Sequence, residues 1–305
     1  MNPPSSAVPD ERIGIGFGIL AYGIWGVLPL YWHVIADVPP VQITAFRILF
    51  CAVFLALVAA ARGRFSRLAF ILTTPSLFRR LALTAALIAA NWTIYVYAIS
   101  SGQLVEASLG YYILPLLSIA LGVLLFGERL SRFRLAAILL AAGAVTVQTV
   151  ALGRLPWIAL ALALSFGFYG YFRKLTEVDP LDGLLVETLV LLPVVLGVMI
   201  YWGLAGRLAF TLAAPQRDLM LTGAGLVTAV PLTLFAAAAR RIRLSTLGFL
   251  QYLSPSISLV IAILLFGEAF TLVNALTFGC VWSALLLVAA EGQVGRLRAR
   301  RLAGE

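Results

Sequence analysis

Polar and aromatic side chains recur inside the long apolar runs of this sequence, where such groups are costly to bury. Asn91 and Tyr95 are four residues apart with Trp92 beside them, and Tyr22 and Trp25 share one face of a predicted helix. A buried amide or hydroxyl requires a partner, which is either a neighbouring helix or a bound solute. The pattern therefore predicts helix packing or a site for a small molecule, and both interpretations stay open at Asn91.

Two related segments carry a further pattern of this kind. Tyr112 and Pro115 recur 140 positions later as Tyr252 and Pro255, with Gln251 next to Tyr252. Proline removes one backbone hydrogen bond from a helix interior, so the two prolines predict helix bends at matched depths. In membrane transporters, interrupted helices at corresponding positions of two related halves mark the binding site.

Three ionisable residues fall within predicted membrane spans, namely Arg47, Glu106 and Glu187. A charged side chain at the centre of a span costs roughly 2.5–3.5 kcal/mol and less near the ends, so each is expected to face the protein interior. We predict that Arg47 faces Glu106 or a polar cavity. The alternative is that Arg47 lies near the interface and extends its guanidinium group to the surface.

The residues needed for most enzymatic chemistry are missing from the sequence. It has one His, His33, and two Cys, Cys51 and Cys280, which stand far apart, so no Cys/His cluster can bind zinc. It has no Gly-rich phosphate-binding loop that ends in Lys, and no Ser/His/Asp arrangement stands out. We therefore expect no catalytic residue, no metal and no cofactor. A membrane-embedded enzyme or an accessory subunit is the alternative.

The composition shows which solvent surrounds these side chains. The 305 residues are 62% hydrophobic and 11% charged, with a mean hydropathy of +1.02. Soluble domains carry roughly 25% charged residues, so this chain cannot cover its surface in water. Apolar runs of about 20 residues are typical of transmembrane helices. The predicted spans are 13–33, 43–61, 81–100, 104–126, 134–152, 156–173, 183–203, 219–239, 244–266 and 271–290.

The positive charges indicate how these spans are oriented. If the N-terminus is cytoplasmic, 18 of the 22 Lys and Arg residues fall in cytoplasmic segments. Cytoplasmic loops are enriched in positive charge, so both termini are predicted to be cytoplasmic. This enrichment of positive charge also accounts for the net charge of +9 and the pI near 10.1. We therefore expect the lipid bilayer, and not nucleic acid, as the partner of this chain.

A sequence repeat divides the chain into two halves. Leu124–Glu128 reads LLFGE, and the same five residues recur as Leu264–Glu268. Each half holds five predicted spans, and an odd number turns the second half upside down relative to the first. We predict a cytoplasmic tail (1–12), a first repeat (13–152), an inverted second repeat (156–290) and a basic cytoplasmic tail (291–305). The stretch Phe65–Leu77 is predicted to be an interfacial amphipathic helix.

Several motifs resemble the RarD branch of the EamA family of drug/metabolite transporters, over about residues 12 to 290. The motifs are Tyr22-Gly23-Ile24-Trp25-Gly26, Ala90-Asn91-Trp92, Glu106-Ala107-Ser108-Leu109-Gly110-Tyr111 with Pro115, Phe126-Gly127-Glu128-Arg129-Leu130, and Leu244-Ser245-Thr246-Leu247-Gly248-Phe249 with Gln251-Tyr252 and Pro255.

This resemblance implies an all-α integral membrane protein with ten transmembrane helices in two inverted five-helix repeats. It implies a central cavity and export of small metabolites, such as amino acids or amphipathic compounds, across the bacterial inner membrane by a secondary transporter. The coupling ion stays open. Together with the spacing argument, the cavity set is Tyr22, Trp25, Asn91, Trp92, Tyr95, Tyr112, Tyr169, Gln251 and Tyr252.

Overall fold

The structure is a computed structural model that describes residues 7–126, 131–239, 241–242 and 250–302. Within this part the chain forms eleven helices and no strand, so the all-helical prediction is confirmed. The helices are α1 (Ala7–His33), α2 (Pro40–Ala61), α3 (Phe65–Thr73), α4 (Pro75–Ser100), α5 (Leu104–Phe126), α6 (Arg132–Leu152), α7 (Trp157–Lys174), α8 (Pro180–Leu204), α9 (Pro215–Ala239), α11 (Leu253–Leu264) and α12 (Leu272–Leu302).

Local sequence explains where several helices begin. Pro40, Pro75 and Pro180 open α2, α4 and α8, at a position where the missing N–H has no intrahelical partner to lose. The N-cap side chain of Ser131 accepts a hydrogen bond from the N–H of Arg134 at the start of α6. Such caps satisfy first-turn N–H groups that the helix itself leaves free.

Some boundaries differ from the sequence prediction. The stretch Phe65–Leu77 is not a single interfacial helix, because α3 ends at Thr73 and Pro75 already opens α4. The last helix continues to Leu302, well past the predicted end of the span at 290. The beginning of the predicted span 244–266 and the Gly127–Leu130 part of the repeat motif lie outside the described residues.

Six helices in the described part are long and apolar enough to cross a membrane: α1, α2, α4, α6, α8 and α9. Shorter apolar segments occur in α5, α11 and α12. The lengths and composition of these helices agree with a multi-pass membrane protein.

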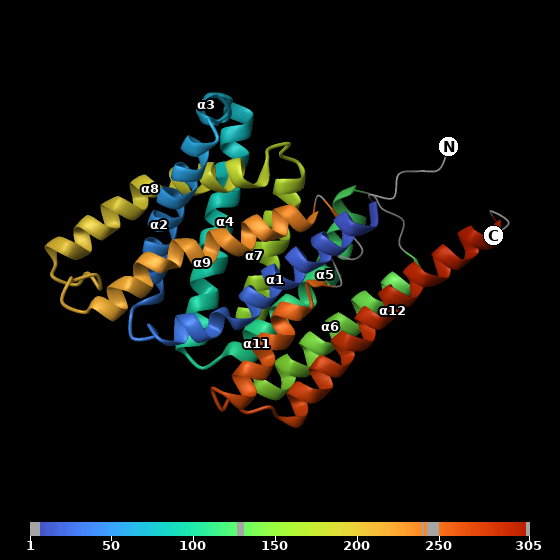
Figure 1. Ribbon diagram of the computed structural model, residues 1–305. Coiled ribbons are helices and arrows are strands. Elements are labelled where there is room, and N and C mark those ends of the chain that lie inside the picture. The colour runs from blue at the N-terminus through green and yellow to red at the C-terminus, as the bar shows by residue number, and fades with distance from the viewer. Residues whose placement is uncertain (1–6, 127–130, 240, 243–249, 303–305) are drawn as a thin grey trace, which may run out of the picture.

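Helices from the two halves of the chain pack against one another (Figure 1). Helix α2 lies against α8 and α9, α1 against α9 and α11, and α7 against α4 and α5. Helices α6 and α12 run side by side, and α5 contacts α11. The buried core is therefore assembled mainly between the halves and not within each half.

Two glycines allow the closest of these helix contacts. A Cβ atom on Gly225 of α9 would lie 2.3 Å from the carbonyl carbon of Phe50 in α2. A Cβ atom on Gly110 of α5 would lie 2.6 Å from the carbonyl oxygen of Ala159 in α7. Small residues let helix backbones approach closely in membranes, where dispersion contacts drive association.

We expect Gly225→Ala to lower the free energy of unfolding by about 1–3 kcal/mol, because the added methyl group meets backbone that cannot rotate away. Thermal unfolding of the detergent-solubilised protein measures the change. Gly197→Ala in α8 is the matched control, since a Cβ atom there has no neighbour within 4 Å. It should stabilise α8 by about 0.5–1 kcal/mol. Equal effects of the two substitutions would contradict the tight α2–α9 contact.

Candidate functional site

The nine residues predicted to line a cavity fall into separate groups in the structure. Asn91 and Tyr95 of α4 lie with Tyr169 of α7 in what we name the central cluster, which also contains Tyr111 of α5 and Phe166 of α7. The ring of Trp92 lies instead against the guanidinium group of Arg47 in α2. The other predicted residues lie elsewhere. The division follows from helix geometry, because neighbouring residues on a helix point about 100° apart.

Asn91 is the polar centre of the central cluster and is only 1% exposed. Its Nδ2 donates hydrogen bonds to the carbonyl oxygen of Leu162 (3.1 Å) and to Oγ of Ser165 (3.0 Å), both in α7. Its Oδ1 accepts a hydrogen bond of 3.2 Å from the hydroxyl of Tyr111 in α5. One amide therefore joins three helices from the two halves of the chain.

Aromatic rings continue the central cluster from α4 to α7. The rings of Tyr95 and Tyr111 meet edge to face with their centroids 5.6 Å apart. Tyr111 meets Phe166 at 6.4 Å, and Phe166 meets Tyr169 at 5.6 Å. Edge-to-face pairs at these distances are favourable arrangements of aromatic quadrupoles.

Glu187 of α8 lies at the end of this aromatic series and is completely buried. Its carboxylate accepts hydrogen bonds from Oγ1 of Thr84 (2.7 Å) and the hydroxyl of Tyr169 (3.3 Å), and lies 3.7 Å from Nε of Arg173. Gly183 leaves the space that the Arg173 guanidinium occupies, since a Cβ there would sit 2.0 Å from Nη1. The sequence analysis did not single out Thr84 or Arg173 as partners of Glu187.

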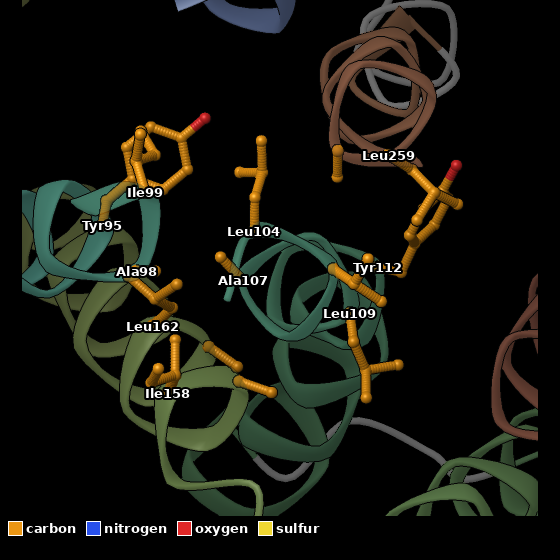
Figure 2. Close-up of a cluster of buried hydrophobic side chains, with 14 of the residues drawn as sticks. Tyr95, Ala98, Ile99, Leu104, Ala107, Leu109, Tyr112, Ile158, Leu162 and Leu259 are labelled. Atoms are coloured by element: carbon orange, nitrogen blue, oxygen red, sulfur yellow. The ribbon is translucent and has the colours of Figure 1, made fainter. Parts of the chain in front are cut away.

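Two further groups hold the remaining aromatic predictions. Tyr22 and Trp25 of α1 pack with Phe235 of α9, with centroid distances of 5.3–6.1 Å. Tyr112 stacks on Tyr252 at 6.1 Å, and the rings of Phe278 and Trp282 in α12 meet it edge to face. Figure 2 shows Tyr95 and Tyr112 on opposite sides of α5. Tyr111, not Tyr112, is therefore the α5 tyrosine of the central cluster.

The remaining predicted positions are also placed. Gln251 is half-buried in a turn just before α11. Pro115 lies inside α5, whereas Pro255 lies in the first turn of α11, where a proline removes no hydrogen bond from a helix interior. The two prolines thus occupy different places in their helices.

The prediction was that Arg47 faces Glu106 or a polar cavity, and the structure does not pair Arg47 with Glu106. Glu106 lies 3.3 Å from Nη2 of Arg154, and its Oε1 accepts a 3.0 Å hydrogen bond from the N–H of Ile158 in the first turn of α7. A helix N-terminus has free N–H groups and attracts a carboxylate, which explains this pairing. Arg47 is 5% exposed and donates from Nε to Oγ1 of Thr228 at 2.7 Å, so it does not extend to the surface.

Glu268, the last residue of the second repeat motif, caps a helix of the other half. Its Oε1 and Oε2 accept hydrogen bonds from the N–H groups of Leu104 (2.7 Å) and Val105 (2.8 Å), the first residues of α5. Burial raises the pKa of the Glu268 carboxyl group, and the two N–H donors act in the opposite direction. The motif thereby fastens the loop before α12 to the beginning of α5.

The described residues contain no group of three or more His, Cys, Asp or Glu side chains that could hold a metal ion. The central cluster offers hydroxyl, amide and aromatic groups.

Comparison with known proteins gives concordant matches. Residues 12–149 match the model of the EamA-like transporter family. An uncharacterized transporter of Vibrio cholerae is 40% identical over 96% of this chain and 97% of its own length. The protein RarD of Streptomyces exfoliatus is 39% identical over 92% of this chain and 89% of its own. A solved crystal structure with 18% identity superposes over 90% of this chain and 96% of its own, with a TM-score of 0.59, which indicates a shared fold.

We expect Glu268→Gln to lower the free energy of unfolding by about 1 kcal/mol, because an amide offers one acceptor and no charge to the N-terminus of α5. Thermal unfolding in detergent measures the loss. Glu177→Gln, at an exposed position between α7 and α8, is the control and should have no measurable effect. A Glu268→Gln protein as stable as the control would show that the cap contributes nothing.

Proposed function

This chain belongs to the RarD group of the EamA-like transporter family, and we propose from this premise that it is a secondary transporter that exports small amphipathic metabolites, such as amino acids, by alternating access. It is a multi-pass membrane transporter of a bacterial family. The observation that carries the proposal is the central cluster, in which polar and aromatic side chains from both halves of the chain meet inside the bundle.

The helix packing supports two inverted five-helix repeats. The offset of 140 residues relates α1 to α7, α2 to α8, α4 to α9, α5 to α11 and α6 to α12. Under this exchange, the contacts of α1 with α9 and α11 become the contacts of α7 with α4 and α5, and all four occur. The α2–α9 contact becomes α8–α4, and three related pairs also touch each other directly. Such reciprocity is expected of a pseudo-two-fold arrangement.

Contacts between loops support the proposed orientation with both termini in the cytoplasm. Arg64 pairs with Asp182 at 3.0 Å, and the topology assigns both residues to the cytoplasmic side. Gln42 donates a hydrogen bond to the carbonyl oxygen of Arg207 at 2.8 Å, and the topology assigns both to the outer side. The beginning of α1 and the end of α12 both lie at the right of Figure 1.

The surroundings of the central cluster support a small amphipathic solute. The cluster contains the rings of Tyr95, Tyr111 and Tyr169 together with the amide of Asn91. Binding sites for small molecules are mostly apolar and use a few fixed polar groups for orientation. We infer that rocking of one repeat against the other opens this region to either side in turn.

The inverted topology predicts that equivalent loops label from opposite sides. Asp37 and Glu177 are related by the repeat offset and are both exposed, and Cys51→Ala and Cys280→Ala provide a cysteine-free background. In intact cells, a membrane-impermeant maleimide should label Asp37→Cys from outside, whereas Glu177→Cys should react only after permeabilisation. Labelling of both positions from one side would rule out the inverted arrangement.

Transport itself is tested with proteoliposomes that are loaded with amino acids and aromatic amphipathic compounds. We expect at least one compound to leave the vesicles faster than from protein-free vesicles and to be recovered chemically unchanged by mass spectrometry. Asn91→Leu should slow this release by about tenfold or more, because it removes polar contacts at the cluster. Asn274→Leu, which changes an amide between α6 and α12, is the control. Covalently altered products would favour an enzyme instead.

A further inference from the structure

In the part of the chain that the structure describes, Arg47 lacks the ion-pair partner that the buried residues Glu106, Asp182 and Glu187 have. It lies seven residues after the first residue of α2, with 5% of its surface exposed. Glu106 is paired with Arg154, and Glu187 is paired with Arg173. No acidic side chain among the described residues pairs with Arg47. A buried charge is normally neutralised by a partner, because its separation from water is costly.

The hydrogen bonds of Arg47 leave most of its donors free. A guanidinium group carries five N–H donors. Within the described part of the chain, Arg47 donates one hydrogen bond, from Nε to Oγ1 of Thr228. The hydroxyl of Thr228 in turn donates to the carbonyl oxygen of Ala224 at 2.8 Å. The two terminal NH₂ groups of Arg47 therefore find no acceptor among the described residues.

Two tryptophan rings hold the Arg47 guanidinium in place. Its central carbon lies 4.0 Å from the ring centroid of Trp92 and 5.2 Å from that of Trp32. These contacts are cation–π interactions, which orient a guanidinium group without neutralising its charge. The indole Nε1–H of Trp32 is itself buried and has no hydrogen-bond partner. Arg47 and its neighbour Trp32 thus both carry donors without an acceptor among the described residues.

The repeat allows Arg47 to be compared with Glu187, the residue at the equivalent position of the second half. Position 47 corresponds to position 187 by the offset of 140 residues. Each of the two side chains bonds a threonine in the opposite half of the chain. Arg47 bonds Thr228 of α9, and Glu187 bonds Thr84 of α4. Glu187 has a counter-charge supplied by the protein, Arg173. Arg47 instead lies beside the rings of Trp32 and Trp92. Glu187 therefore has a counter-ion from its own half, and Arg47 has none among the described residues.

From this contrast we infer that Arg47, held between Trp32 and Trp92, binds the anionic group of the transported solute, a carboxylate, with the apolar part of the solute lying against the indole rings. The inference rests on the proposed transport function and specifies the solute class as small aromatic or amphipathic acids. A guanidinium group binds a carboxylate through two parallel hydrogen bonds, so the free terminal NH₂ groups match this ligand.

A matched set of probes tests the inference with the full-length protein in detergent. The probes are 3-phenylpropionate, its uncharged amide, and phenyl phosphate, and the readout is the dissociation constant from thermal-shift titration. We expect 3-phenylpropionate to bind the wild-type protein about tenfold or more tightly than the amide does. Tighter binding of phenyl phosphate than of the carboxylate would overturn the assignment of the ligand as a carboxylate.

Three variants test whether Arg47 is the residue that binds the carboxylate of the probe. Arg47→Met should weaken binding of 3-phenylpropionate by about tenfold or more while amide binding changes less than about twofold. Arg47→Lys keeps the charge without the fork of donors and should fall between wild type and Arg47→Met. Arg207→Met, at an exposed position outside the helices, should match the wild type. A purely structural Arg47 would instead weaken binding of the carboxylate and the amide equally.

The result that overturns the inference is equal binding of the carboxylate and the amide by the wild-type protein, or no binding of either anion. Undiminished binding of 3-phenylpropionate by Arg47→Met also overturns it. If Arg47→Met does not fold, the inference is tested by the comparison of the probes on the wild-type protein and by Arg47→Lys. Transport of carboxylate solutes at wild-type rates in Arg47→Met liposomes would remove the inference and leave the proposed function intact. If the wild-type protein transports none of the compounds, the proposed transport function is wrong. The binding measurements still test whether Arg47 binds a carboxylate.

Discussion

The hydrocarbon core of a membrane offers no water to a polar group, and this constraint decides which side chains of the bundle must meet. Several buried polar residues bond neighbouring helices. Asn91 joins α4 to α7 and α5, and Glu187 joins α8 to α4 and α7. Gln148 of α6 likewise bonds Asn274 and Thr277 of α12. These three residues therefore connect helices within the apolar bundle.

The same constraint acts at the helix ends, where first-turn N–H groups need acceptors. Helix α5 stands at the centre of this arrangement. Glu268 of the second half caps its N-terminus, and its own Glu106 caps the N-terminus of α7. A carboxylate at a helix N-terminus gains both hydrogen bonds and a favourable helix dipole. These caps join the halves on the face that the topology assigns to the outside, and a transporter that opens on that face has to rearrange the contacts around them.

The two buried charges at repeat-related positions illustrate how a duplicated scaffold acquires a function. Glu187 is neutralised within the protein, so its cluster stabilises one packed arrangement. Arg47 is oriented by Trp32 and Trp92 and bound by Thr228, and it keeps donors available. Preorganised donors in a low-dielectric interior bind a matching anion strongly. The inferred recognition rests on this difference between two positions that the sequence offset of 140 residues relates.

The sequence by itself determined the helical class, the positions of most helices, the repeat and the family, because these depend on local hydropathy, prolines and motifs read along the chain. It also identified Asn91, Tyr95 and Tyr169 as residues of the interior. Only the tertiary structure decided the partners. It placed Tyr111 and not Tyr112 in the central cluster, gave Glu106 to Arg154 and the start of α7, and set Arg47 between two tryptophans. Periodicity shows that a side chain points inward, but the helix that it meets depends on rotations and crossings of distant segments, which no local pattern encodes.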